Sequence, residues 1–403
     1  MKGHVCEKGK GNWYAVVDVR DPITGKRKRK WHSLKAKGKR EAQAECAKIV
    51  ADIASGAYIE PNKVTLADFL DRWLEHCKSQ VSPKTHERYS GLINQNIKQR
   101  LGATVLSKLK PDRIAAAYSD ALAGGRGDKK EGGLAPRTVG HMHRVLKRAL
   151  HQAVRWELIP RNPVDAVDPP KVDWKPVQTY DLTQTADVIE AVRGKPIFVP
   201  AMLAVLCGLR RGEICALRWR NVDLVGGQLS VVESLEQTKA GLRFKSPKSG
   251  KGRTVALSQT AIDELRAHRA RRAEELLRLG VRLSEDDLVI AHPDGTVIPP
   301  IYVSQQWSRT IAKTELARLR FHDLRHAHAT HMLANGVHPK VASERLGHSK
   351  IGITLDLYSH VIPGMQEDAA RTVDSALQAA IRNRAEAKGR SPVEALPRGT
   401  GHE

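Results

Sequence analysis

The stretch that most constrains this chain is Phe321–Val361, FHDLRHAHATHMLANGVHPKVASERLGHSKIGITLDLYSHV. It contains a His-x-x-Arg pair, His322 and Arg325, then a Leu-Gly-His that ends at His348, then Tyr358. An arginine keeps its charge, imidazoles titrate near neutral pH, and a phenol can act as a nucleophile. The set therefore suits a site that holds a phosphate, moves protons and forms a covalent bond.

The charge of the chain points to a polyanionic partner. Its 403 residues suffice for two or three domains. The 67 Lys and Arg outweigh 44 Asp and Glu, for a formal net charge of +23, which favours nucleic acid. A membrane is the competing partner, but no stretch reaches the roughly 18 to 20 apolar residues of a spanning helix. The basic N-terminus also lacks the apolar region of a secretory signal.

The cysteines and aromatic residues further limit the kinds of site and the modes of binding that we expect. The five cysteines form no CxxC pair and are odd in number, so we expect neither disulfides nor a zinc ribbon. This fits a reducing cytoplasm. Only four Phe and seven Tyr are present, so stacking on bases is not the expected main mode of binding.

Two regions that precede the central stretch carry ordered positive charge. The first forty residues hold 13 Lys and Arg against 3 acidic residues, over two predicted strands (12–20 and 26–34), a turn (21–25) and a helix (40–54). This pattern favours a DNA-binding module over a solubilising arm.

Four helices are then predicted. Thr65 caps the first, over 65–78, and prolines at 83, 111 and 136 open the others. Their polar faces are a solvated surface or a phosphate-contacting one, and carry Lys84, Arg88, Lys98, Arg100, Arg137, Arg144 and Lys147.

A Pro-rich strip over 160–176 is predicted to be an extended linker. Beyond it the pattern is mixed. We expect strands at 228–232 and 253–257 in a small antiparallel sheet, and helices at 183–192, 200–206, 258–279, 302–319, after 322, and 374–387.

Two further clusters could contribute to a site. In Gly208–Glu213, GLRRGE, the glycine breaks an apolar helix, so Arg210 on the bend can point into a cleft with Glu213 as its buttress; a surface basic turn is the alternative. In Lys245–Val255 a lysine at a hairpin tip can donate a proton, or only contact phosphate.

The histidines after Phe321 invite a metal hypothesis. On a helix, His322, Arg325 and His326 share one face, and the two histidines have the i,i+4 spacing of metal ligands. However, the chain has no HExxH and no cysteine nearby, so we expect no metal site. His326, His328 and His331 are instead predicted to be structural.

Together, the GLRxGE, HDLRH and LGHS…TLDxYSH blocks resemble the tyrosine recombinases of the phage integrase type. The match covers about 175–380, and more loosely the two regions before it. The resemblance implies these site residues: the catalytic arginines Arg210 and Arg325, the hairpin lysine Lys248, the pocket residues His322 and His348, and the nucleophile Tyr358. Lys245 and Lys251 remain rivals to Lys248, because the hairpin holds several cations.

The implied fold class is multidomain and mainly α. We expect a small β-plus-helix arm-type DNA-binding domain at 1–58, a helical core-binding domain at 64–158, a mixed α+β catalytic domain at 175–385, and a disordered tail at 386–403.

The residue types fit phosphodiester chemistry. Two guanidiniums can neutralise the phosphate, Tyr358 can attack, His322 can accept a proton, His348 can bind the phosphate, and Lys248 can protonate the departing 5′-oxygen. The resemblance implies a 3′-phosphotyrosyl intermediate, which keeps the bond energy. The chain has no GxxxxGK[ST] loop, and we expect no ATP, metal or other cofactor.

The expected function is site-specific recombination that integrates or excises a prophage or other mobile element. The expected partners are double-stranded DNA at core-type and arm-type sites, further copies in a homotetramer, and accessory DNA-bending or directionality factors. The expected location is the cytoplasm of a bacterial host. Alternatives are a chromosome-dimer or plasmid resolvase, a non-catalytic DNA-binding regulator, and a metal-dependent transposase.

Overall fold

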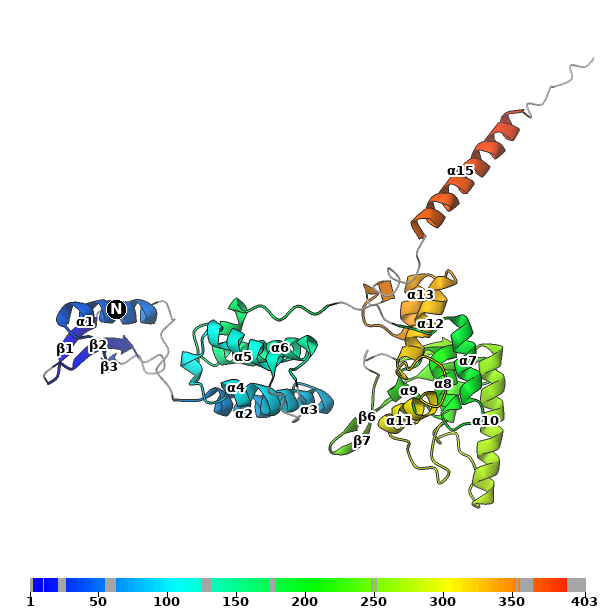
Figure 1. Cartoon of the computed structure of the whole chain (residues 1–403), viewed down its shortest axis with the longest axis horizontal. Helices are drawn as coiled ribbons and strands as arrows, with labels where there is room; N and C mark the ends of the chain where they lie inside the picture. The colour runs from blue at the N-terminus through cyan, green and yellow to red at the C-terminus, as the bar shows by residue number, and fades with distance from the viewer. Residues whose placement is uncertain are drawn as a thin grey trace, which may run out of the picture. The chain divides into compact units, whose positions relative to one another are not determined.

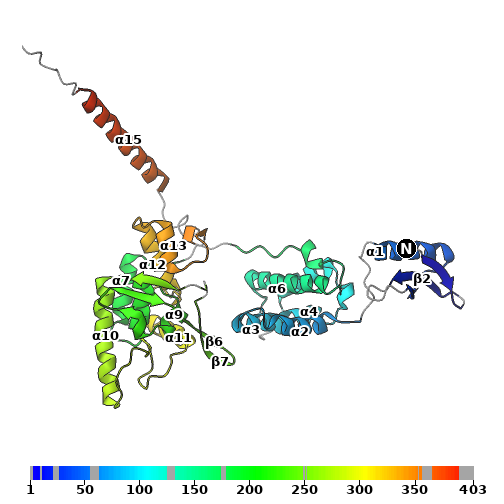
Figure 2. The same cartoon turned by 180° about the vertical axis from the view of Figure 1, so that it is seen from behind.

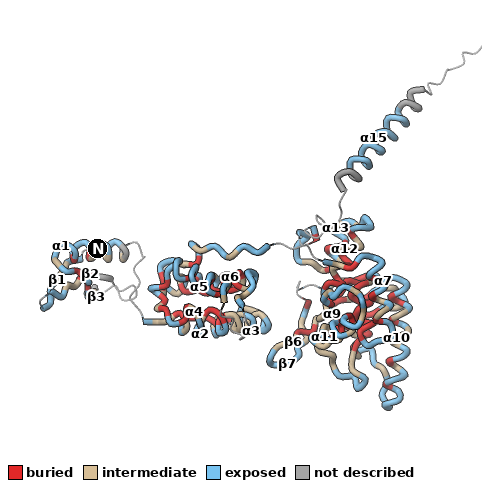
Figure 3. Tube along the Cα trace, in the orientation of Figure 1, coloured by how far each residue is buried: buried red, intermediate tan, exposed pale blue. Residues whose placement is uncertain are grey.

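The computed structural model describes residues 3–9, 11–20, 27–54, 63–124, 132–173, 178–247, 250, 252–352, 354–355 and 365–389 (Figure 1). The chain divides into two compact units, Met1–Trp174 and Lys175–Glu403. Within the described residues, the first unit contains two separate hydrophobic cores and the second contains one (Figure 3).

The first core lies in a small sheet region. Strands β1 (Gly3–Glu7), β2 (Trp13–Arg20) and β3 (Arg27–Ser33) form an antiparallel sheet in that order, and α1 (Lys39–Ala54) packs on it. The two predicted strands and the helix are confirmed, whereas β1 was not predicted. The turn predicted at 21–25 lies outside the described residues.

The second core lies in a helical region. It contains α2 (Leu66–Cys77), α3 (Pro83–Leu92), a π-helical turn η1 (Ile93–Ile97), α4 (Lys98–Leu101), a short 3₁₀ turn η2 (Leu106–Lys108), α5 (Pro111–Ala123) and α6 (Pro136–Arg155). Thr65 and Asp68 form a reciprocal capping box at the start of α2. The four predicted helix starts are confirmed.

The Pro-rich strip was predicted to be an extended linker, and for its first part this prediction is wrong. A 3₁₀ turn, η3 (Pro163–Ala166), packs against this second core and buries Val164. Asn162 holds it in place, because its side chain accepts a hydrogen bond from Val164 N and donates one to Lys147 O, each at 3.0 Å.

The C-terminal unit is built around α8 (Phe198–Cys207), in which nearly every side chain is buried. Around it lie α7 (Leu182–Val192), α9 (Arg211–Ala216), α10 (Gln259–Arg278), α11 (Pro300–Ile311), α12 (Asp323–Ala334) and α13 (Pro339–Leu346), seen from behind in Figure 2. Strands β4 (Val222–Asp223), β5 (Gln228–Val231) and β8 (Arg253–Ala256) form an antiparallel sheet that follows the 3₁₀ turn η4 (Trp219–Asn221). The predicted pairing of β5 with β8 is confirmed.

Two predictions in this unit were wrong. The helix expected over 302–319 ends at Ile311, because the following segment turns back and Leu319 O accepts a hydrogen bond from Trp307 Nε1 at 2.8 Å. A further hairpin, β6 (Ser234–Thr238) with β7 (Gly241–Lys245), also lies between β5 and β8. The lysine-rich segment therefore links β7 to β8 and is not the tip of a hairpin made by β5 and β8.

The last helix, α15 (Met365–Gly389), is longer than the predicted 374–387. It continues past residue 386, where the disordered tail was predicted to begin, and residues 390–403 lie outside the described part of the chain. Among the described residues, no helix is both long and apolar enough to cross a membrane.

Candidate active site

Gly208 brings Arg210 into the site. The glycine ends α8 in the left-handed region at φ 64°, and a Cβ there would lie 2.6 Å from Cδ2 of His328. The turn therefore requires glycine, both for its backbone angles and for space. Arg210 follows as the cap of α9, and Glu213 accepts hydrogen bonds from its backbone N at 2.9 Å and its Nη1 at 2.8 Å. The predicted contact between Glu213 and Arg210 is present.

Arg325, the predicted second arginine, reaches the same place from α12. Its side chain is 3% exposed and donates hydrogen bonds to Gly208 O and Leu346 O, at the ends of α8 and α13. Burial and the charge of Arg210 lower the pKa of Arg325 to about 9, so it remains protonated at neutral pH. Two of its N–H groups bind carbonyls, which leaves three for an anion.

His348 follows α13 and joins this group. Gly347, in the left-handed region at φ 63°, ends the helix, and Gly347 O accepts a hydrogen bond from Arg210 Nη2 at 2.7 Å. His348 Nδ1 lies 2.8 Å from Oγ1 of the fully buried Thr354, which fixes the ring. Burial lowers the pKa of His348 to about 4, with Arg325 and Arg210 adding to the effect, so the ring is neutral at pH 7.

His322 caps the start of α12 and is exposed to solvent. Its ring packs edge-on against His326, with ring centroids 5.0 Å apart. Desolvation by the surrounding protein lowers its pKa to about 4, followed by the effects of His326 and Arg325. Within the described residues, no group of three or more His, Cys, Asp or Glu side chains is placed to hold a metal.

The other two histidines have the structural roles predicted for them. His328 Nδ1 donates to Val205 O at 2.7 Å, and its Nε2 lies 3.2 Å from Arg345 Nε. Arg345 Nη2 also donates to Leu206 O at 3.1 Å. These side chains satisfy carbonyls at the end of α8 that lack partners within the helix. His331 contacts Thr185 of α7 at 3.0 Å.

The lowered histidine pKa values predict acid sensitivity. His322, His328 and His348 have folded-state pKa values of about 4 against 6.5 when unfolded. The unfolded chain therefore gains protons first as pH falls, and the stabilisation present above pH 6.5 is lost towards pH 4. The buried His328 alone can account for about 3 kcal/mol. Glu213, whose pKa is lowered to about 2, contributes to the loss of stability only at lower pH.

Urea unfolding of the intact chain between pH 7 and 5, with hydrogen exchange of the α12 amides, measures this loss. His328→Asn should flatten the dependence, because one of the titrating groups is removed. A free energy of unfolding that stays level or rises on acidification would contradict the expectation.

The remaining predicted residues are not all placed. Lys248, Lys251 and Tyr358 lie outside the described residues, so their roles stay predictions. Lys245 is described, and it forms an ion pair with the buried Glu236 on the neighbouring strand. That pairing occupies the ammonium of Lys245 within the hairpin and favours the other two lysines as the proton donor.

Sequence reasoning missed Arg253, at the start of β8. Its Nη1 and Nη2 donate to the two oxygens of Glu213 at 3.0 and 2.7 Å. Burial of Glu213 raises its pKa, but the hydrogen bonds and charges of Arg253 and Arg210 outweigh this and lower it to about 2. The site thus gathers Arg210, Arg253 and Arg325 around one carboxylate, an excess of positive charge that suits a phosphate.

Some Lys and Arg side chains of the helical region form ion pairs with carboxylates, and others cluster around His141. The side chain of Arg100 is 8% exposed and bound to Asp120, so it is not the surface phosphate contact that was considered. Lys98 likewise pairs with Asp71 at 2.5 Å. In contrast, Arg88, Arg137 and Arg144 lie close enough to His141 to lower its pKa, after the larger effect of desolvation.

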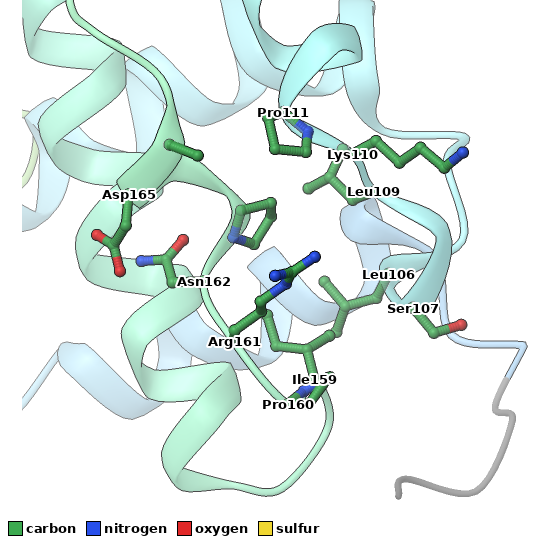
Figure 4. A pocket seen from close by; sticks show the side chains of 12 residues that line it. Leu106, Ser107, Leu109, Lys110, Pro111, Ile159, Pro160, Arg161, Asn162 and Asp165 are labelled. Atoms are coloured by element: carbon green, nitrogen blue, oxygen red, sulfur yellow. The ribbon is translucent and has the colours of Figure 1, made fainter. Parts of the chain in front are cut away.

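The helical region also contains a pocket of about 590 Å³ between the start of α5 and the segment around η3 (Figure 4). Its lining includes Leu106, Leu109 and Ile159, with Lys110 and Arg161 among its polar residues. None of the predicted catalytic residues lines it.

Three family descriptions match the chain in order. They are an arm DNA-binding domain at residues 5–53, the SAM-like N-terminal domain of phage integrases at 65–121, and the phage integrase family at 178–364. The chain belongs to the phage integrase family of tyrosine recombinases. The predicted fold class, mainly α with a small β-plus-helix first domain and a mixed last domain, is confirmed.

Similar proteins span most of the chain. A protein named tyrosine recombinase XerC-like from Caldanaerobacter subterraneus is 27% identical over 395 residues, which cover 93% of this chain and 98% of the relative. The ICEBs1 integrase of Bacillus subtilis is 24% identical, with 89% of this chain and 95% of the relative covered.

Solved structures show the same fold. The Tn1549 transposon integrase, in complex with transposon right end DNA, matches with a TM-score of 0.64 at 20% identity, over 78% of this chain and 99% of that one. A lambda integrase tetramer bound to a Holliday junction matches with a TM-score of 0.54 at 21% identity, over 88% of this chain and 94% of that one.

Proposed function

We propose that this recombinase cuts and rejoins DNA through a 3′-phosphotyrosyl intermediate at Tyr358, and integrates or excises a prophage or other mobile element. The observation that carries the proposal is that Arg210 and Arg325, from separate segments, both bind backbone carbonyls at the ends of α8 and α13, close enough to His348 for their charges to act on its ring. An excess of buried positive charge there is stabilised by an anion.

In the proposed reaction, the free N–H groups of Arg210 and Arg325 bind the non-bridging oxygens of the phosphate and offset the charge that grows in the transition state. Tyr358 Oη forms a bond to phosphorus while the bond to the 5′-oxygen breaks. Neutral His322 accepts the phenolic proton, and Lys248 donates a proton to the 5′-oxygen, which leaves as a hydroxyl. The reverse attack by a new 5′-hydroxyl reseals the strand.

His348 acts on the phosphate in this scheme. If the Thr354 hydroxyl donates to Nδ1, the neutral ring carries its proton on Nε2 and can donate it to a phosphate oxygen. The negative charge of bound DNA would also raise the pKa of both imidazoles above their values in the free protein.

Neither a metal ion nor ATP is part of this proposal, because the arginines supply the positive charge and the phosphotyrosine keeps the bond energy. Supercoiled plasmid carrying an attachment site should therefore be nicked and relaxed in EDTA without ATP. Lack of nicking under every condition would support a DNA-binding regulator, and an absolute need for Mg²⁺ would support a metal-dependent transposase.

We further propose that the chain binds double-stranded DNA in two places. The arm-type domain at 1–58 would take arm sites, and the core-binding domain at 64–158 would take core sites next to the catalytic domain at 175–385. The Arg88, Arg137 and Arg144 cluster supports the second assignment. Related integrases solved on DNA, one of them a tetramer, support a homotetramer here.

We also propose that accessory DNA-bending or directionality factors take part in the reaction. The proposed location of the protein is the cytoplasm of a bacterial host. A chromosome-dimer or plasmid resolvase would use the same chemistry, but it has no need of the N-terminal arm-type domain.

A further inference from the structure

Arg253 is enclosed at the centre of the site although it is outside the set of residues implied by the family resemblance. It is the first residue of β8 and pairs with Val231 of β5. Its side chain is 9% exposed. Besides its two bonds to Glu213, Nε donates to Arg345 O at 2.8 Å, so each of its three nitrogens already has an acceptor.

These contacts join three segments that carry site residues. Glu213, held by Arg253, in turn holds Arg210 at the start of α9. Arg345 O belongs to the last turn of α13, which leads to His348. Arg253 also lies against Gly347, where an added Cβ would be 3.0 Å from both its Cδ and its Nη1. The guanidinium therefore touches the supports of both Arg210 and His348.

We propose that Arg253 is a positioning residue that holds Arg210 and His348 in register for the scissile phosphate. The inference rests on the proposed function. The backbone N and Nη1 of Arg210 hold one oxygen of Glu213 each, and the bidentate bond from Arg253 adds a second donor to each oxygen. The carboxylate is then fixed from two sides, and Glu213 holds the guanidinium of Arg210 in one orientation. Arg253 acts through Glu213 because its own nitrogens are engaged.

Lysine cannot reproduce this geometry, since an ammonium is a point charge without the planar fork of arginine. Arg253→Lys keeps the charge and should leave DNA affinity unchanged. We expect it to slow formation of the covalent complex on a nicked suicide substrate, in a single turnover, by about 10- to 100-fold.

Arg272→Lys is the matched control. The side chain of Arg272 is 8% exposed and pairs with Glu275 at 2.8 Å, so it is as enclosed as that of Arg253, and it also donates to a backbone carbonyl, His292 O, at 3.0 Å. Its substitution should lower the melting temperature without changing the cleavage rate of the folded protein. An equal slowing in both variants would show a general loss of stability and overturn the proposal.

A double-mutant cycle tests the route of the effect. If Arg253 works through Glu213 on Arg210, then Arg253→Lys should add little to the slowing caused by Arg210→Lys. Fully multiplicative effects would overturn that route. Should Arg253→Lys fail to fold, the pair Arg253→Gln with Glu213→Gln removes both buried charges. It should fold and cleave slowly, and cleavage by this pair at the wild-type rate would overturn the proposal.

The wild-type protein separates this inference from the proposed function. If wild type forms no covalent complex, the proposed function fails whatever Arg253 does. If wild type reacts and Arg253→Lys reacts equally fast, only the positioning role fails.

Discussion

Tyr358→Phe is expected to abolish the covalent complex with DNA and to leave DNA binding intact. The substitution removes one oxygen, the atom proposed to attack phosphorus, and keeps the ring. No strand cleavage should then occur, since the phenol supplies the nucleophile and water is not part of the proposed reaction. A suicide substrate resolved on a denaturing gel measures the adduct, and a mobility shift measures binding.

Tyr302→Phe provides a control within the same unit. The Tyr302 hydroxyl accepts a hydrogen bond from Gln306 at 2.6 Å on α11 and has no proposed chemical role. This variant should form the adduct at the wild-type rate. An adduct that survives in Tyr358→Phe would instead disprove the assignment of Tyr358.

Arg325→Lys is expected to have the second largest effect. Arg325 binds two carbonyls while it keeps N–H groups for the phosphate, and lysine cannot do both from a single ammonium. Loss of one preorganised donor to a growing charge typically costs about 3 to 4 kcal/mol, or roughly 10²- to 10³-fold in rate. The measurement is the single-turnover cleavage rate at saturating protein.

Arg272→Lys again serves as the control, because it removes the same fork from an equally enclosed arginine in α10. If Arg325→Lys cleaved within a few-fold of this control, the guanidinium of Arg325 would not bind the reacting phosphate.

The sequence predicted the helices well and the connections between them poorly. Helix starts at Thr65, Pro83, Pro111 and Pro136 were correct because caps and N-terminal prolines act locally. Strand β1 and the β6–β7 hairpin were missed, since β1 (GHVCE) and β6 (SLEQT) lack a sustained alternation of apolar and polar residues. The end of the 302–319 helix was wrong because a tertiary bond, from Trp307 to Leu319 O, overrides local helical propensity.

The same limit applies to the site. The motif blocks located Arg210, Arg325 and His348, and the structure brings them together. Arg253 could not be found this way, because its partner Glu213 lies forty residues earlier and only the folded chain joins them. Charge counting likewise could not distinguish Arg100, which is held by Asp120, from the unburied cluster around His141.

The backbone carbonyls at the end of α8 make DNA cleavage depend on the packing of α12 and α13. Val205 O, Leu206 O and Gly208 O are held by side chains from α12 and α13, and the same contacts bring Arg325 into place. A partly folded molecule in which α12 has come away lacks this arginine. Newly made or damaged copies should therefore break chromosomal strands far more slowly, since fast cleavage needs α12 to be packed on the end of α8.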